Sequence, residues 1–333
     1  MVGRGGYSNY HNSLHHLLVR WLITANRGIF SAVIRANKQI GQQFYRLALE
    51  FSGAGAETFA RFRPGQFAQL DLSTAALPPA EAMPEDLADS ARREILLRRP
   101  FSFADITAQR SKTLAEILYH VLGPATLRMT TLSPGDSISV IGPLGNGFEV
   151  PTGKKTAVLV SGGMGVPPLQ HLAKFLTANY PQITVTAFAG AKTAKDLPFE
   201  GRLDAISQEL GFSLPEFARY GIKSLVATDD SSAGFAGLVT DCLAQWLEES
   251  RPLPQTTIIY ACGPEAMLAK VSQIAYQRRI DCQISMEQRM ACGFGVCQSC
   301  AVQCRVTSST ETIYKLCCED GPVFDSREVV FNE

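Results

Sequence analysis

The chain has 333 residues, 46% of them hydrophobic, which is enough for two or three domains with their own cores. Its 31 basic and 31 acidic residues balance, so we expect no nucleic-acid partner. We also expect no membrane association, because no apolar run reaches the roughly 18 to 20 residues of a membrane span. The nine cysteines are too few and too clustered for a secreted disulfide scaffold, and they favour a reducing cytoplasm.

The start of the chain differs from the rest. The first acidic residue is Glu50, while several arginines precede it, among them Arg4 and Arg20. An acid-poor start with arginines is typical of a transit peptide. An extra amphipathic arm, or residues translated from an upstream start codon, would explain it as well. We therefore treat residues 1–28 as an N-terminal extension and assign no function to them.

Residues 29–150 predict an antiparallel β-barrel. The segments 44–51, 65–72 and 136–142 are expected strands, bounded by glycine and proline. The Pro- and Ala-rich segment 75–94 is an expected surface loop.

From residue 151 onward, short apolar strands alternate with helices. Strands are expected at 156–160, 183–190, 223–228 and 256–263, and helices at 169–180 and 238–250. This alternation predicts a parallel α/β domain over residues 151–280. Residues 281–333 form a small cysteine-rich domain. The expected fold is therefore all-β followed by α/β, with a small C-terminal domain.

The stretch "SGGMGVPP" follows an expected strand and opens a helix. Gly162, Gly163 and Gly165 let the main chain turn sharply and approach a pyrophosphate, which the N–H groups at a helix start attract. An ordinary tight turn between strand and helix is the alternative, because this is not the G-x-G-x-x-G motif.

A second loop, "YACGPEAML", has the same strand–glycine–helix form and supplies Cys262, Gly263 and Pro264. Two such loops at the carboxyl ends of parallel strands predict a dinucleotide crevice, with Cys262 beside the nicotinamide. Asp229 and Asp230 end another strand and can accept hydrogen bonds from ribose hydroxyls. They would repel a 2′-phosphate, which favours NAD over NADP; a solvated turn is the alternative.

Two segments of the barrel are candidates for a flat cofactor with a diphosphate. In "RRPFSF", Arg99 can neutralise the diphosphate, Phe101 can pack on the ring and Ser102 can bond to a ring nitrogen. An exposed strand end is the alternative. In "LYHVLGPATLRM", a strand leads through Gly123 to a helix start that carries the hydroxyl of Thr126. His120 is either a flavin neighbour or a half-buried strand residue.

Near the C-terminal end, Cys292, Cys297 and Cys300 are spaced C-x4-C-x2-C. This spacing followed by one distant cysteine is typical of plant-type [2Fe–2S] clusters, whereas structural zinc sites prefer two C-x2-C pairs or mixtures of Cys and His. Cys317 and Cys318 are both candidates for the fourth ligand, and Cys304 is a poorer one.

Taken in order, these motifs resemble a known family. "LLRRPFS", "LYHVLGPAT", "GGMGVPPL", "YACGPEAML" and "RMACGFGVCQSC" with "CEDGPVF" are similar to the electron-transfer subunits of class 1B dihydroorotate dehydrogenases. The resemblance covers roughly residues 30–333, and the wider group resembles ferredoxin–NADP reductases. It implies FAD in the barrel, a [2Fe–2S] cluster in the C-terminal domain and NAD as the external partner of electron exchange.

The resemblance also implies ligands and a partner. FAD would be held by Arg99, Pro100, Phe101, Ser102, Leu118, Tyr119, His120, Ala125 and Thr126. The cluster would be held by Cys292, Cys297, Cys300 and Cys318. The implied partner is an FMN-containing dihydroorotate dehydrogenase catalytic subunit, in a heterotetramer of two of each, in pyrimidine biosynthesis. Ala125 in place of the usual glycine, the 75–94 insertion and the long linker from Cys300 to Cys318 depart from the pattern.

Because the organic chemistry belongs to the cofactors, we expect no catalytic acid or base in this chain. Alone, it should oxidise NADH with an artificial acceptor but should not oxidise dihydroorotate. Two alternatives stay open at this point. One is a flavin/iron–sulfur NAD(P)H reductase subunit that serves a hydrogenase or an oxygenase. The other is a zinc-stabilised nucleotide sensor without turnover.

Overall fold

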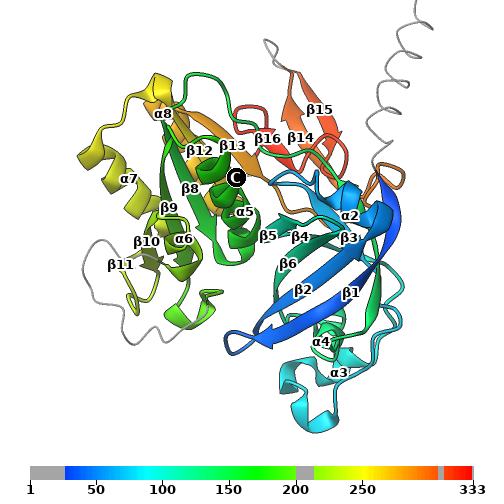
Figure 1. Cartoon of the computed structure of the whole chain (residues 1–333). Helices are drawn as coiled ribbons and strands as arrows, with labels where there is room; N and C mark the ends of the chain where they lie inside the picture. Colours follow the sequence, from blue (N-terminus) through cyan, green and yellow to red (C-terminus); the bar gives the residue numbers. More distant parts are fainter. Residues whose placement is uncertain (1–26, 200–213, 307–310, 332–333) are drawn as a thin grey trace, which may run out of the picture.

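The computed structural model describes residues 27–199, 214–306 and 311–331. An antiparallel sheet, a parallel sheet and a small cysteine-rich lobe follow one another along the chain (Figure 1). This is the predicted fold class. Almost all of the expected N-terminal extension lies outside the described residues. Among the described helices, none has the length and hydrophobicity of a membrane span.

The first sheet is antiparallel and forms the barrel. Its strands are, in spatial order, β4 (Arg99–Ser102), β3 (Phe67–Leu70), β7 (Ser137–Leu144), β1 (Gly28–Gln39), β2 (Phe44–Ser52), β6 (Lys112–His120) and β5 (Asp105–Ala108). Phe51 and Phe59 stack in its core with ring centroids 3.9 Å apart. Phe59 comes from the short helix α2 (Gly53–Phe59), and α4 (Pro124–Met129) adds Leu127 and Met129 to the same core.

The segment expected to be a surface loop, 75–94, contains short helical turns. They are η1 (Ala80–Ala82), η2 (Glu85–Leu87) and α3 (Ala88–Ala91). Leu87, Ala91 and Ile95 are buried in the barrel core. Leu87 and Ala91 are four residues apart across the helical turns and so lie on one side of them, which explains why this charged segment coils locally.

The second sheet carries the nucleotide-binding features. Its strands are, in spatial order, β11 (Phe235–Ala236), β10 (Lys223–Thr228), β9 (Thr184–Ala191), β8 (Thr156–Gly162), β12 (Thr257–Cys262), β13 (Asp281–Ser285) and β16 (Val323–Asp325). All neighbours are parallel except β13 and β16. The order reverses at β8, with β9 on one side and β12 on the other. In open α/β sheets, such a reversal marks the crevice in which ligands bind.

Helices cover both faces of this sheet. The longer ones are α5 (Val166–Asn179), α7 (Val239–Ser250) and α8 (Glu265–Arg278), and the short ones are α6 (Pro215–Ala218), η3 (Gly163–Gly165), η4 (Ala194–Asp196) and η6 (Pro254–Thr256). The strands β8 and β12 are almost wholly buried. This burial explains why their sequences are continuously apolar rather than alternating.

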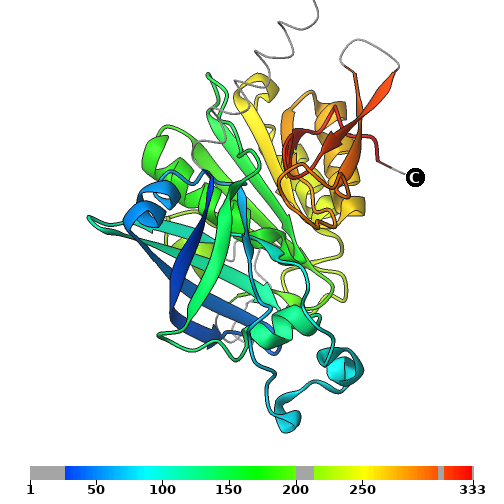
Figure 2. The ribbon, with the colours of Figure 1, turned by 90° about the vertical axis from the view of Figure 1, so that its right-hand side faces the viewer.

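The C-terminal lobe contains a hairpin of β14 (Ala301–Arg305) and β15 (Thr312–Leu316). The chain then returns to the second sheet as β16, which pairs with β13. Figure 2 shows this lobe against the edge of the second sheet and beside the barrel. The long linker from Cys300 to Cys318 is therefore a hairpin, whose pairing brings its two ends together.

Candidate cofactor and iron–sulfur sites

A cleft of about 860 Å³ continues into a second one of about 250 Å³, where the barrel, the second sheet and the C-terminal lobe meet. Volumes of a few hundred Å³ are typical of cofactor sites. The predicted barrel residues that line these clefts are Arg99, Pro100, Phe101, Ser102, Leu118, Tyr119, His120, Gly123, Ala125 and Thr126. Cys262, Gly263 and Pro264 line them from the second sheet. The fold thus brings two distant groups of predicted residues to one place.

Arg99 suits an anionic ligand. Its guanidinium donates to the carbonyl oxygens of Leu97 at 2.6 Å and Arg98 at 3.3 Å. In the described part of the chain no carboxylate pairs with it, so its charge is available to a diphosphate. The hydroxyl of Thr126 is engaged locally, because it accepts the N–H groups of Leu122 and Gly123 at 3.0 and 3.3 Å.

His120 fits both of its predicted roles. It is half-buried, lines the cleft and stacks on Phe44 with ring centroids 4.2 Å apart. Its Nε2 lies 3.2 Å from the side-chain oxygen of Gln43. Burial lowers the pKa of His120, against a weaker opposing effect of Asp196. The lowered pKa favours a neutral imidazole at neutral pH.

Tyr119 faces the other way. Its ring is buried in the barrel core, stacks on Tyr45 and donates a hydrogen bond to Asn37 at 3.0 Å. Burial raises the pKa of the Tyr119 phenol. This arrangement leaves the main chain of Tyr119 to face the cleft.

The two glycine loops meet at the point where the sheet order reverses. A Cβ atom on Gly165 would lie 1.9 Å from the carbonyl oxygen of Cys262, and one on Gly263 would lie 2.9 Å from the nitrogen of Gly162. Only glycine allows the loops to approach so closely. Gly163 has a φ of +51° and open space around it. Gly162, Gly163 and Gly165 line neither cleft, unlike Gly263, and they act by shaping the crevice edge.

Asp229 directly follows β10 at the same edge of the sheet and lines neither cleft. It is exposed. Its neighbour Asp230 accepts the N–H and the hydroxyl of Ser232 at 3.0 and 2.5 Å, which lowers the pKa of Asp230. Asp230 thus closes its own turn, whereas the carboxylate of Asp229 has no side-chain partner among the described residues.

One segment of the cleft wall has no counterpart among the predicted site residues. It runs from Ser285 to Met290, directly after β13. Leu97, Leu122, Met164, Pro167, Pro168, Glu265, Leu268, Phe67, Pro124 and Pro322 also line the clefts. Sequence reasoning could have found this segment from its place after a strand, because a segment that leaves the carboxyl end of a parallel strand emerges at the ligand-binding edge.

The C-terminal hairpin directs the two neighbouring cysteines, Cys317 and Cys318, to different partners. The Sγ atoms of Cys300 and Cys318 lie 3.3 Å apart, at the two ends of the hairpin. Cys317 points elsewhere, and its Sγ donates to the carbonyl oxygen of Met286 at 3.4 Å. Burial raises the pKa of Cys317, which keeps it a neutral thiol. This geometry supports Cys318 over Cys317 as the fourth ligand.

The loop between the cysteines directs N–H groups at sulfur. The N–H of Gly295 donates to Cys318 Sγ at 3.2 Å, and the N–H of Cys297 donates to Cys292 Sγ at 3.4 Å. A hydrogen bond from the main chain of Cys292, and then one from Ser299, lower the pKa of Cys297 to about 6. Gly293 and Gly295 have φ values of +78° and +85°, which favour glycine.

These donors fit an iron–sulfur cluster. Burial first, and then the neighbouring Cys300, raise the pKa of Cys318 to about 12, so a metal that binds there displaces its proton. Within the described residues, no three Cys, His, Asp or Glu side chains converge on a single metal-sized point. A [2Fe–2S] cluster uses its four thiolates as two pairs, one pair on each iron, and needs no such group of three.

Comparisons with known proteins agree with this geometry. Residues 287–330 match the model of the iron–sulfur cluster binding domain of dihydroorotate dehydrogenase B, and residues 159–273 match that of the oxidoreductase NAD-binding domain. The chain is 25% identical, over 90% of both chains and with a TM-score of 0.66, to a structure titled as an NADH-dependent reduced ferredoxin–NADP oxidoreductase. The fold is shared by a Neisseria gonorrhoeae ferredoxin NADP⁺ reductase with bound FAD and NADP, at 17% identity, covering 75% of this chain and 91% of that one with a TM-score of 0.51.

Fold and site together define an oxidoreductase of the ferredoxin reductase type that has an added iron–sulfur lobe. Two curated relatives carry the name dihydroorotate dehydrogenase B (NAD(+)), electron transfer subunit. The chain is 36% identical to the one from Bacillus caldolyticus, over 89% of this chain and 96% of that protein. It is 30% identical to the one from Caldanaerobacter subterraneus, over 94% of this chain and all of that protein. The chain belongs to this family of electron transfer subunits, as its motifs predict.

Proposed function

We propose that this chain carries electrons between NAD and the FMN of a dihydroorotate dehydrogenase catalytic subunit, as part of a heterotetramer of two of each. The observation that supports it best is the pairing of Cys300 with Cys318 beside a cleft lined by the predicted FAD residues. A flavin, when bound, converts between the two-electron chemistry of NAD and the one-electron chemistry of a cluster.

The protein's own residues would bind and orient the cofactors. Arg99 would neutralise the FAD diphosphate, while Phe101 and His120 would flank its flat parts. The close glycine loops would admit the dinucleotide next to Cys262. Asp229, open at the end of β10, would accept ribose hydroxyls and favour NAD. The N–H groups of Gly295 and Cys297 would stabilise negative charge on the cluster sulfurs.

We assign FAD to residues 29–150, NAD to 151–280 and the cluster to 281–333. β13 joins the last region to the nucleotide sheet through its parallel pairing with β12. All nine cysteines lie in the described part of the chain and none forms a disulfide, which supports the cytoplasm as the working compartment.

The ligand assignment can be tested by comparing Cys318→Ala with Cys317→Ala after anaerobic purification. We expect Cys318→Ala to lose most of the iron and acid-labile sulfide, and Cys317→Ala to keep both. Both side chains are buried, so the control removes a similar packing contact. Loss of iron from Cys317→Ala alone would overturn the choice of Cys318.

The partner can be tested by purifying a tagged chain from cell extract and identifying the bound polypeptide and its flavin. We expect an FMN-containing polypeptide that oxidises dihydroorotate, while the chain alone oxidises NADH only with an artificial acceptor. Recovery of a hydrogenase or oxygenase component instead would favour the alternative, a flavin/iron–sulfur reductase subunit that serves another partner protein.

A further inference from the structure

Gln69 stands out as a polar side chain buried between the flavin cleft and the cysteine loop. It lies in β3 and is 1% exposed. Its neighbours in the strand, Ala68 and Leu70, pack into the barrel core. Because side chains alternate along a strand, Gln69 points to the opposite side, together with Phe67. Phe67 packs in the cluster of buried residues that contains Cys317 and Cys318.

The strand pairing places Gln69 next to the cofactor cleft. Gln69 is opposite Pro100 in β4, which lines both parts of the cleft. On its other side it is opposite Ile141 in β7, which packs against the same buried residues as the cysteines. Directly opposed residues of an antiparallel pair share a face of the sheet. Gln69 is therefore on the side of the barrel that the C-terminal lobe covers.

The amide of Gln69 lies against the cysteine loop itself. A Cβ atom on Gly293, the residue after Cys292, would be 2.2 Å from the amide nitrogen and 2.6 Å from the amide carbon of Gln69. The same nitrogen is buried and has no hydrogen-bond partner in the described part of the chain. A buried N–H group without a partner carries a free-energy cost, so a native structure retains one where something absent from the polypeptide accepts it.

We propose that Gln69 donates a hydrogen bond to a sulfur of the cluster on its Cys292 side and thereby raises the reduction potential of the cluster. Reduction adds negative charge to the cluster, and a donor to sulfur stabilises the reduced form more than the oxidised one. Only the nitrogen end of the amide attracts sulfur, which fixes its orientation. Gln69 is thus a positioning and tuning residue, and its role rests on the cluster assignment proposed above.

The test uses two variants of nearly the same shape, Gln69→Met and Gln69→Glu, purified anaerobically in the full chain. Met removes the donor, and Glu replaces it with a carboxylate oxygen that repels sulfur. We expect both to keep wild-type iron content. We expect the midpoint potential of the cluster, followed by electron paramagnetic resonance during a redox titration, to fall in Gln69→Met and to fall further in Gln69→Glu.

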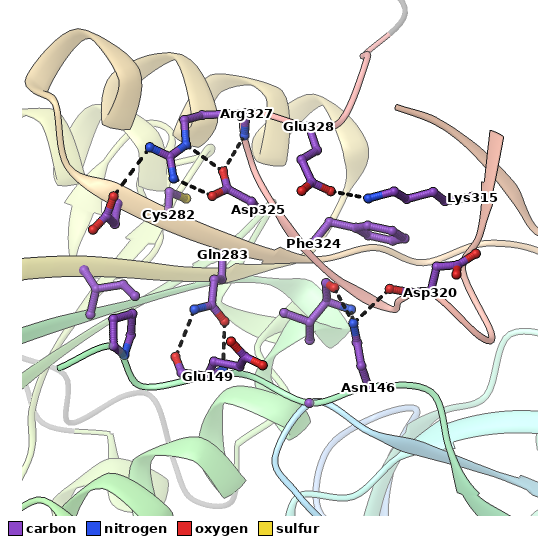
Figure 3. A pocket seen from close by; sticks show the side chains of 15 residues that line it. Asn146, Glu149, Cys282, Gln283, Lys315, Asp320, Phe324, Asp325, Arg327 and Glu328 are labelled. Carbon is purple, nitrogen blue, oxygen red and sulfur yellow. Dashed lines mark hydrogen bonds and ion pairs between the residues drawn. The ribbon is translucent and has the colours of Figure 1, made fainter. Parts of the chain in front are cut away.

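Gln283→Met is the matched control. The amide of Gln283 is fully engaged with the main chain of Glu149, at 2.9 Å for both bonds, in a separate polar cavity of about 400 Å³ (Figure 3). The midpoint potential of the cluster in Gln283→Met should equal that of the wild type. An unchanged potential in loaded Gln69→Met would overturn the proposal, as would loss of iron from both Gln69 variants, because Gln69 would then only pack against the loop. If the wild-type chain itself holds no iron, it is the cluster assignment that fails.

Discussion

The barrel meets its two neighbours through junctions of opposite character. Toward the helices α5 and α6 of the nucleotide-binding domain, long charged side chains supply the polar contacts. Lys174 of α5 donates to Asp105 Oδ1 at 2.5 Å, to the carbonyl of Ile106 at 2.8 Å and to the hydroxyl of Thr107 at 2.7 Å. Arg46 of β2 reaches Glu216 of α6 at 3.3 Å. We call these contacts the charged junction.

Toward the C-terminal lobe, main-chain groups and close packing make the contacts. The side-chain nitrogen of Asn146 donates to the carbonyls of Asp320 and Val323 at 2.9 and 2.8 Å (Figure 3). Its side-chain oxygen accepts the N–H of Val323 at 2.9 Å. Next to it, Gly145 is so close to Pro322 and Gly321 that a side chain on it would clash with them. We call these contacts the packed junction.

The difference indicates which parts of the molecule are fixed relative to one another. Long ionic side chains can keep their contacts over a range of separations, whereas interlocked main chain has one arrangement. We infer that the cysteine loop and the neighbouring strand β16 are held rigidly on the barrel, while the side of the nucleotide-binding domain that carries α5 and α6 can adjust its distance from it. A fixed spacing suits electron transfer between flavin and cluster, and an adjustable one suits the entry and release of a dinucleotide.

The strongest way to break the packed junction is Gly145→Ala. Gly145 has a φ of +68°, and an added Cβ would lie 2.6 Å from Pro322 Cδ and 2.7 Å from the carbonyl oxygen of Gly321. Backbone strain of roughly 1 kcal/mol or more and overpacking of roughly 1–3 kcal/mol should add. We expect the free energy of unfolding to fall by about 3 kcal/mol, measured by urea titration of the cluster absorbance.

Gly135→Ala is its matched control. Gly135 has a φ of +99° but open space around the Cβ position, so it carries only the backbone strain. The free energy of unfolding of Gly135→Ala should fall by about 1 kcal/mol. Equal losses in the two variants would show that the packed junction yields easily, and the comparison between the junctions would then be wrong.

The charged junction should respond to acid, through His171 of α5. This side chain is buried, stacks on Phe62 of the barrel at 6.0 Å between ring centroids, and its Nδ1 has no partner in the described residues. Burial lowers the pKa of His171 to about 4, with Asp105 opposing the shift and Lys174 adding to it. Between pH 6.5 and 4 the unfolded chain therefore binds a proton that the folded chain does not.

Stability should accordingly be greatest above pH 6.5 and should fall as the pH drops toward 4, by up to about 3 kcal/mol. Urea titrations across this pH range measure the slope, and His171→Leu should flatten it. A slope of the same size in His171→Leu would place the acid sensitivity elsewhere in the protein.

The sequence predicted those features that rest on local pattern. The strand β10 covers the expected residues 223–228, because its apolar run is short and bounded. The glycine loops and the C-x4-C-x2-C spacing predicted the crevice and the cluster, since their chemistry is contained within one segment. The cysteine spacing alone left Cys317 and Cys318 open, and the family resemblance named Cys318. The turn after β15 supports this choice, because it directs the two neighbouring side chains to different partners.

Other features depend on contacts between distant segments. Nothing local to Gln69 shows that its amide will face Gly293, because that contact arises only when the C-terminal lobe covers the barrel. The cleft wall at 285–290 also could not be predicted from local sequence, because its role follows from where β13 lies in the sheet. The helical turns within 75–94 depend on the burial of Leu87 and Ala91 by the barrel.

The smallest effect should come from cutting one ionic contact of the charged junction with Lys174→Met. The pair with Asp105 is partly exposed, at 30% and 19% of the two side chains, so its loss should cost only about 1 kcal/mol. Its signature is salt dependence. Raising ionic strength from about 0.05 to about 0.5 M should weaken the wild type more than Lys174→Met, because salt screens a pair that the variant lacks.

Lys270→Met, on the exposed face of α8, is the control, because Lys270 makes only a long contact with Gln273 at 3.4 Å. Amide hydrogen exchange tests whether the two junctions move independently. In Lys174→Met, amides of β5 should exchange faster, while those around Asn146 should exchange as in the wild type. Faster exchange at both places would mean that the two junctions are coupled, and that the cysteine lobe moves whenever the nucleotide-binding sheet does.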